Sequence, residues 1–471
     1  MAFDLLTRIG GDRAMLGVFS EERAVHDWLV VEAQLALALA DAAVIEPASA
    51  ERIAAACVPE TVDRDRLWVE AANVGYPILP LVKMICAAVS EQDAAVVHYG
   101  ATTQDIMDTA LALQLRDAGA RLIALVDRFG TDLARLVEDH ATTVMPGRTH
   151  AQQAVPTTLG AKLAVVLDEL TRHRERLVDA IEAAAVVSLF GAGGTGAGLG
   201  SDGPAVRSLL ARRLRLGDTS VPWHVARDRV VGLTGAAALL GAACARFGRE
   251  IIDLSRTEVG EVAEADGLYR GASSTMPQKA NPISSELAVG WGIMATAHHD
   301  AALRAMEAGH ERAAGEWQAE WQAVPGALVA TAGALAAVGD IAANLRVFPE
   351  RMAANLDLDG GRIMAEAYMF ALAPHLGRDH GHEVVYAAVR RSRAEGTPLR
   401  EALRLSLTDE VWASIESHLP EPSAYLGTTS EICRTAVASW RAATTQASSP
   451  APAHPGLLRA PDSHPHQGEQ R

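Results

Sequence analysis

Proline spacing constrains the fold of this chain more than any other feature of its sequence. Proline breaks the interior of a helix and alanine loses no side-chain entropy there, so long alanine-rich stretches without proline predict helices. Aromatic residues make up only 4% of the chain, which disfavours an all-β fold. Five such stretches, each predicting one long helix, occur at residues 81–145, 157–203, 223–276, 283–324 and 326–348.

The apolar residues of these stretches repeat with the period of a helix. Between Val230 and Leu254 they alternate by three and four residues. A second stripe repeats every seven residues, at Leu115, Leu122, Phe129 and Leu136. A helix with such a stripe cannot bury it alone, so the helices must pack against one another. We therefore predict an all-α fold, with three helical domains around a bundle of long helices that subunits share.

Shorter and more interrupted patterns flank the long helices on both sides. We predict an N-terminal helical domain at 1–97, a central long-helix bundle at 98–345 and a C-terminal helical domain at 346–442. The last residues, 443–471, are a mixture of Pro, Ser, Ala and His that is typical of a disordered tail.

Charge and composition exclude several classes of partner. The formal net charge is −16, from 58 acidic and 42 basic side chains, and no basic stripe is evident. We therefore expect neither nucleic acid nor a membrane surface as a partner. The first residues lack the pattern of a signal peptide, and every apolar run of membrane-spanning length contains charged residues. The four cysteines form no C-x-x-C pair, so we expect a cytoplasmic protein.

Three polar segments interrupt the helices, and the third, GASSTMPQKANPISSE (271–286), carries the most chemistry. A long loop of small residues between two helices is more often functional than structural. Ser273 is a weak base unless something stabilises its alkoxide. Lys279, one of only three lysines in the chain, and Asn281 can bind a carboxylate whose charge grows as a neighbouring proton leaves. A solvated Ser/Pro linker is the alternative interpretation.

The second polar segment, GRTHAQQ (147–153), places His150 beside Thr149 and Gln152. Histidine exchanges protons near neutral pH and can act as an acid or a base, although a lone histidine is more often structural. Glu286, at the start of the helix that Pro282 opens, is a candidate partner that would orient it.

The first polar segment, HYGATTQD (98–105), precedes a long helix. Thr102 or Thr103 can cap that helix, next to Gln104, and leave backbone N–H groups pointing outwards. Helix N-termini bind carboxylates readily, and this role is compatible with simple capping. Arg312 is a candidate second carboxylate clamp, with an ion pair on a helix surface as the alternative.

Together the three segments resemble the active-site segments of the fumarase/aspartase superfamily, and the resemblance extends over residues 4–440. GASSTMPQKANPISSE is similar to the flexible signature loop of that superfamily, G-S-S-x-M-P-x-K-x-N-P. The resemblance implies a helical homotetramer in which each active site draws on three subunits. It also implies that a proton leaves next to a carboxylate and a group leaves the neighbouring carbon, usually giving fumarate. No metal and no organic cofactor is implied.

The resemblance assigns a role to each candidate residue. Ser273 matches the loop serine that acts as base, His150 the general acid or relay, and Glu286 its carboxylate partner. Lys279 and Asn281 match the carboxylate binders of the loop. The substrate-binding positions of the family match Thr102, Thr103, Gln104, Thr149 and Gln152.

Two further segments, VPWHVARDRV (221–230) and HERAAGEWQAEW (310–321), are similar to the 3-carboxy-cis,cis-muconate cycloisomerase branch of the superfamily. That branch often carries a bulky residue where His150 stands, and Gln278 and Ala280 replace residues usual in its loop. A cycloisomerase-like scaffold with the acid–base set of a fumarate-forming lyase resembles nitrosuccinate lyases, which split nitrosuccinate into fumarate and nitrite. We expect that reaction first and the cycloisomerase second, in either case on a small dicarboxylate or tricarboxylate.

Three other functions stay open. An adenylosuccinate-type lyase is disfavoured because NVGYPILP (73–80) lacks a His and 310–321 lacks a Ser-Ser-x-x-Arg phosphate-binding run. The segment GAGGTG (191–196) matches the dinucleotide-binding pattern G-x-G-x-x-G, which would suit an NAD-binding protein, but no alternating strands and helices surround it. The third is an inactive helical scaffold, and the presence of all the matched site residues argues against it.

Overall fold

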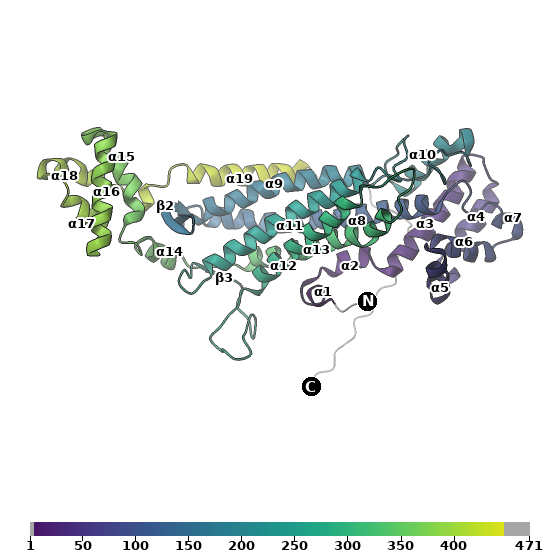
Figure 1. Ribbon diagram of the computed structural model, residues 1–471, viewed down its shortest axis with the longest axis horizontal. Coiled ribbons are helices and arrows are strands. Elements are labelled where there is room, and N and C mark those ends of the chain that lie inside the picture. The colour runs from purple at the N-terminus through teal and green to yellow at the C-terminus, as the bar shows by residue number, and fades with distance from the viewer. Residues whose placement is uncertain (1–3, 447–471) are drawn as a thin grey trace.

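The computed structural model of the chain describes residues 4–446, and these are mostly helical (Figure 1). The predicted all-α fold is confirmed. Six long helices lie side by side in the central bundle, which is formed by α8 (Thr103–Asp139), α9 (Leu159–Ala184), α11 (Asp228–Leu254), α12 (Ile283–Arg304), α13 (Glu316–Asn344) and α19 (Thr429–Gln446).

The break between α12 and α13 does not fall at a proline, which corrects one prediction. Pro325 lies inside α13, and the chain breaks instead over residues 305–315, where Gly315 takes a φ of +125° before the helix begins. An interior proline costs a helix about 3 kcal/mol. Val324 and Leu328, both fully buried, show how the apolar contacts of α13 offset that cost.

Two short helices, α1 (Leu5–Gly10) and α2 (Arg13–Val18), pack on the central bundle. A group of shorter helices at one end of the bundle surrounds a second apolar core. They are α3 (Glu21–Asp41), α4 (Pro47–Ala56), η1 (Pro59–Thr61), α5 (Arg64–Val74), α6 (Ile78–Ala87), α7 (Glu91–Ala94), η2 (Gly200–Asp202) and α10 (Gly203–Leu214). Because α10 packs on α3, this core includes residues far along the chain as well as the first hundred.

A third apolar core lies at the opposite end (Figure 1). Its helices are α14 (Pro349–Leu356), η3 (Arg362–Met364), α15 (Ala365–Leu376), α16 (Arg378–Glu395), α17 (Leu399–Arg404), α18 (Asp409–Ile415), η4 (Glu416–His418) and η5 (Pro422–Ala424). The division of the chain at residues 97 and 345 stays a prediction. Helix α19 continues to Gln446, so residues 443–446 of the predicted tail are helical, and 447–471 lie outside the described residues.

Two small antiparallel sheets complete the described structure. β1 (Val144–Thr149) pairs with β2 (Gln152–Thr158), and β3 (Val262–Ala263) pairs with β4 (Arg346–Val347). The second polar segment therefore forms a β-hairpin and does not flank a helix. His150 and Ala151 have φ values of 49° and 61°, as the two-residue turn of a tight hairpin requires.

Helices α11 and α13 are long and apolar enough, by length and composition, to cross a membrane. In α11, 67% of the apolar window is buried inside the fold, and in α13 the share is 72%. Their apolar surface is therefore explained by packing in the bundle, where they contact each other and α12.

Candidate active site

The signature loop, residues 271–282, is closed at its neck by Asn281. The backbone N–H and the side-chain Nδ2 of Asn281 both donate to the Gly271 carbonyl, at 2.8 and 2.9 Å. A Cβ at Gly271, whose φ is +66°, would lie 2.3 Å from the Asn281 carbonyl oxygen, so only glycine fits there. Asn281, the predicted carboxylate binder, therefore holds the loop in shape, and one of the two donors on its side-chain nitrogen is used within the loop.

Ser273 lies within the closed loop, where its Oγ accepts two backbone hydrogen bonds. The Thr275 N–H donates at 3.3 Å and the Met276 N–H at 3.2 Å. Two fixed donors aimed at one oxygen stabilise negative charge on it, which is what a serine base needs. Lys279 is exposed on the same loop, and its ammonium has no side-chain partner among residues 4–446. Both predicted residues are thus accessible on one small loop.

Both ends of the segment that carries the loop are anchored to the bundle. The Glu264 carboxylate accepts the backbone N–H groups of Ser284 and Ser285, at 3.1 and 2.7 Å, at the start of α12. Glu264 is therefore a carboxylate cap for the positive end of that helix. Glu286, in the same first turn, is exposed, and no hydrogen bond or ion pair joins it to His150 within residues 4–446.

The hairpin carries Thr149, His150 and Gln152 at its exposed tip. Next to the tip, Arg148 anchors the hairpin, because its guanidinium makes two hydrogen bonds, of 2.6 and 2.9 Å, to the Glu261 carboxylate. Glu261 directly precedes β3, from which the chain runs towards the signature loop. One buried carboxylate therefore fixes the hairpin relative to the root of the loop.

At the start of α8, Thr102 caps the helix and Thr103 is half-buried. Gln104 is fully buried, and its Nε2 donates to the His224 carbonyl at 2.8 Å. Its Oε1 is buried and has no hydrogen-bond partner among residues 4–446, and the assignment of Gln104 to substrate binding stays a prediction. The side chain points inwards because it begins the buried stripe of α8.

Arg312 lies beside Thr102, in the loop before α13. Its Nη1 is 3.4 Å from the Thr102 Oγ1, and its Nη2 donates to the Ala192 carbonyl at 3.1 Å. Arg312 is neither on a helix nor paired with a carboxylate in the described part of the chain. Its fixed charge at a helix N-terminus instead suits the binding of a carboxylate.

One chain does not bring all the predicted residues together. Helix α8 has 37 residues, and at 1.5 Å per residue it is about 55 Å long. Thr102 lies at its N-terminal end, whereas the hairpin follows its C-terminal end and packs on α14 (Figure 1). His150 and Thr102 of the same chain therefore lie too far apart to contact one small substrate, so a site that used both residues would need more than one copy.

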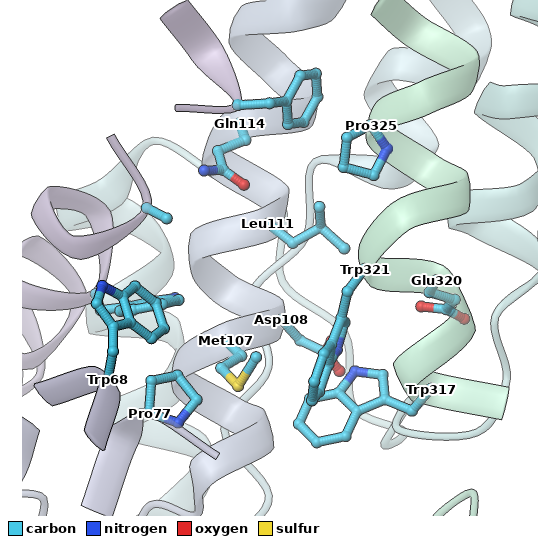
Figure 2. A pocket seen from close by; sticks show the side chains of 13 residues that line it. Trp68, Pro77, Met107, Asp108, Leu111, Gln114, Trp317, Glu320, Trp321 and Pro325 are labelled. Atoms are coloured by element: carbon cyan, nitrogen blue, oxygen red, sulfur yellow. The ribbon is translucent and has the colours of Figure 1, made fainter. Parts of the chain in front are cut away.

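A cavity of about 270 Å³ opens further along α8, between that helix and α13 (Figure 2). Trp317 and Trp321 form one wall of it, and none of the predicted site residues lines it. Asp108 and Glu320 line it as well, but both carboxylates pair with Arg227, at 2.8 and 2.7 Å. Burial raises the pKa of Glu320 despite that pairing.

Comparison with known proteins decides the family. A family model described as "Lyase" matches residues 10–296. The chain belongs to the fumarase/aspartase superfamily of lyases. The Pseudomonas aeruginosa 3-carboxy-cis,cis-muconate cycloisomerase is 39% identical to this lyase over 422 residues, 88% of this chain and 91% of the relative. The Streptomyces davaonensis nitrosuccinate lyase is 36% identical over 425 residues, 86% and 90% of the two chains.

A solved structure agrees with this assignment. The 3-carboxy-cis,cis-muconate lactonizing enzyme of Pseudomonas putida superposes with a TM-score of 0.88 at 36% identity, covering 93% of this lyase and 99% of that chain. Relatives of nearly equal similarity thus carry different reactions, so similarity alone does not decide which one this lyase performs.

The structure also tests the dinucleotide pattern. The glycine-rich run lies in the loop between α9 and η2, and the nearest strand pairing is a single bridge between Val186 and Gly217. The parallel sheet that a Rossmann site needs is absent from residues 4–446. In the same residues, no group of three or more His, Cys, Asp or Glu side chains could hold a metal ion.

Several residues of the site escaped the sequence analysis. Arg148 and Glu261 lie 113 positions apart in sequence, so no local pattern links them. Asp105 was detectable, because a Thr followed three residues later by an acidic residue is a capping-box signature, and the structure forms that box.

Proposed function

We propose that this lyase catalyses anti β-elimination on a small C2-substituted succinate and releases fumarate. The placement of the Ser273 Oγ between two backbone N–H donors, on the loop that also carries Lys279, is the observation that carries the proposal. Ser273 as an alkoxide takes the proton from C3. The electron pair of that C–H bond forms the double bond to C2, and the C2 substituent leaves with its bonding pair.

The charge that develops during this step is placed on the carboxylate next to C3. Lys279 provides a compact positive charge for it, and a helix N-terminus provides N–H groups. Because the start of α8 lies far from the loop of the same chain, Thr102, Thr103 and Arg312 would come from a second subunit. Thr149, His150 and Gln152 on the hairpin would come from a third, with Glu286 orienting His150. We therefore propose a homotetramer with shared active sites, in the cytoplasm.

We propose nitrosuccinate as the substrate, with nitrite as the leaving group. The 36% identity to a nitrosuccinate lyase supports this choice, as does a histidine at position 150 on a cycloisomerase-like scaffold. Nitrite leaves as a stable anion and needs little help from an acid. His150 would then orient the substrate and would not protonate the leaving group.

The second candidate is 3-carboxy-cis,cis-muconate cycloisomerisation, which the 39% identity to a cycloisomerase favours. That reaction closes a lactone by adding a carboxylate oxygen to a double bond and a proton to the carbon next to a carboxylate. It is an elimination run in reverse within one molecule, so the same loop can serve it.

A panel of substrates separates the two candidates. Purified protein is given nitrosuccinate, aspartate, argininosuccinate and adenylosuccinate separately, and fumarate is followed by its ultraviolet absorbance while nitrite is measured in parallel. We expect fumarate and nitrite in equal amounts from nitrosuccinate alone. Consumption of 3-carboxymuconate without any fumarate from the panel would instead assign the cycloisomerase reaction.

A further inference from the structure

The Asp105 carboxylate lies in the first turn of α8, three residues after Thr102. It is fully buried and accepts five hydrogen bonds. The donors are the N–H groups of Thr102, Phe190 and Gly191, the Ser188 hydroxyl and the His224 Nε2, at 3.1, 3.0, 2.9, 2.9 and 2.8 Å. Five donors from different segments fix this carboxylate in one position.

The donors come from three segments that are distant in sequence. Thr102 precedes α8, Gly191 begins the glycine-rich loop 191–200 directly after Phe190, and His224 belongs to the segment before α11. The Gly191 N–H and the Thr102 N–H share one oxygen of the carboxylate, Oδ2. Asp105 therefore joins the loop directly to the N-terminus of the helix.

Arg312 makes a second connection between the same two elements. One of its terminal nitrogens reaches the Thr102 Oγ1 and the other donates to the Ala192 carbonyl. The loop also packs closely on the residues before α8, since a Cβ at Gly198 would lie 3.4 Å from the Gly100 Cα. The glycine-rich loop thus lies beside the cap residue and the arginine that the proposed function uses.

We propose that Asp105 is a positioning residue that folds the glycine-rich loop 191–200 against the start of α8, so that the loop forms one wall of the carboxylate pocket. The inference rests on the proposed function for the identity of that pocket. It also gives the glycine-rich run a role other than dinucleotide binding.

Asp105→Asn tests this proposal sharply, because the amide keeps the shape but carries only one oxygen. Either orientation of the amide sets its NH₂ group against a backbone N–H, that of Gly191 or that of Phe190. We expect faster amide hydrogen exchange in peptides covering 188–200 and about tenfold or greater weakening of fumarate binding by calorimetry, since small misplacements of a binding group are costly. Where turnover is measurable, KM rises by a similar factor and kcat changes less.

Three further variants provide the controls and a substitute for Asp105→Asn. Asp63→Asn removes a carboxylate cap from α5, where Asp63 accepts the Arg66 N–H at 3.0 Å, and it should leave fumarate binding unchanged. If Asp105→Asn does not fold, Gly191→Ala replaces it, because the φ of +72° strains an alanine in the loop. Gly396→Ala, at a φ of +70° beyond α16, imposes the same strain far from the loop and is its control.

The outcomes are distinct. Unchanged exchange in 188–200 would overturn the claim that Asp105 holds the loop. Faster exchange with fumarate binding unchanged would overturn the claim that the loop forms a wall of the pocket. A wild-type protein that binds no dicarboxylate would contradict the proposed function and the pocket wall together, whereas the exchange rates would still decide the role of Asp105.

Discussion

Arg148 on the β-hairpin and Glu261 at the root of the signature loop form a two-bond ion pair, with the Glu261 side chain fully buried. The Asn355 Nδ2 also donates to Glu261, at 2.7 Å. This pair sets the hairpin tip and the loop in a fixed relation at one end of the bundle. It is therefore the joint on which the geometry of two of the three active-site segments depends.

Breaking that pair should destabilise the fold strongly. Arg148→Met leaves the buried Glu261 carboxylate without its cation, and we expect a loss of about 3 kcal/mol in the free energy of unfolding. Arg135→Met, which removes an exposed ion pair with Asp139, is the control and should cost less than about 0.5 kcal/mol. Urea denaturation measures both losses. Equal small losses would show that the Arg148–Glu261 pair does not stabilise the fold.

Lys279→Met should affect the rate more than substrate affinity. Its ammonium would face a carboxylate whose charge grows in the transition state, so we expect kcat to fall by about 10²–10³-fold with a smaller change in KM. Lys83→Met, on an exposed position of α6, is the matched control and should behave as wild type. A higher KM with kcat unchanged would make Lys279 a uniform substrate binder.

The His98–Glu32 pair should make stability depend on pH. The His98 Nδ1 lies 2.6 Å from a Glu32 carboxylate oxygen. Burial lowers the pKa of His98, but the Glu32 carboxylate raises it by more, so the pKa lies above the usual 6.5. The pair therefore contributes its full stability below pH 6.5, and the contribution is lost as the pH rises through the raised folded-state pKa.

We accordingly expect the stability difference between wild type and His98→Gln to be larger near about pH 6 than near about pH 9. Urea denaturation at both pH values gives that difference. His380→Gln, which removes an exposed histidine near Glu383, should show little change between the two. A difference that stays constant, or grows at high pH, would contradict the account of this pair.

Sharing of active sites predicts complementation between inactive variants. Ser273→Ala removes the base from the loop, and Arg312→Ala removes the clamp from the far end of the bundle. If protomers mix at random in a tetramer, about one quarter of the sites contain both wild-type residues, and activity should recover towards that share. The mixture is prepared by joint refolding and assayed against each variant alone. No recovery in a mixture shown to contain mixed tetramers would contradict shared sites.

The long helices and the family were predictable from the sequence, but some placements were not. Proline marks where a helix cannot continue without a cost, yet the buried residues on both sides of Pro325 hold α13 together through it. The family resemblance assigns Gln104 to substrate binding, and the structure shows that its side chain is fully buried. Extending the heptad stripe of α8 back from Leu115 through Asp108 would have placed Gln104 on the buried face.

The β-hairpin and the Arg148–Glu261 pair could not be predicted from local sequence patterns, for a different reason. A turn such as Thr149–Gln152 can follow either a strand or a helix, and only the pairing of β1 with β2 decides it. Contacts between residues far apart in sequence come from the packing of the bundle. The separation of Thr102 from His150 likewise became visible only once α8 was seen as one uninterrupted helix.

The role of Ser273 as the base is the central claim, and one comparison of variants tests it most directly. Turnover of nitrosuccinate to fumarate is measured for Ser273→Ala and for its neighbour Ser274→Ala, an exposed position on the same loop. Loss of the base predicts a fall of about 10²–10⁴-fold for Ser273→Ala, with the helical circular dichroism unchanged, and near-normal turnover for Ser274→Ala. Near-normal turnover by Ser273→Ala would contradict the proposed mechanism.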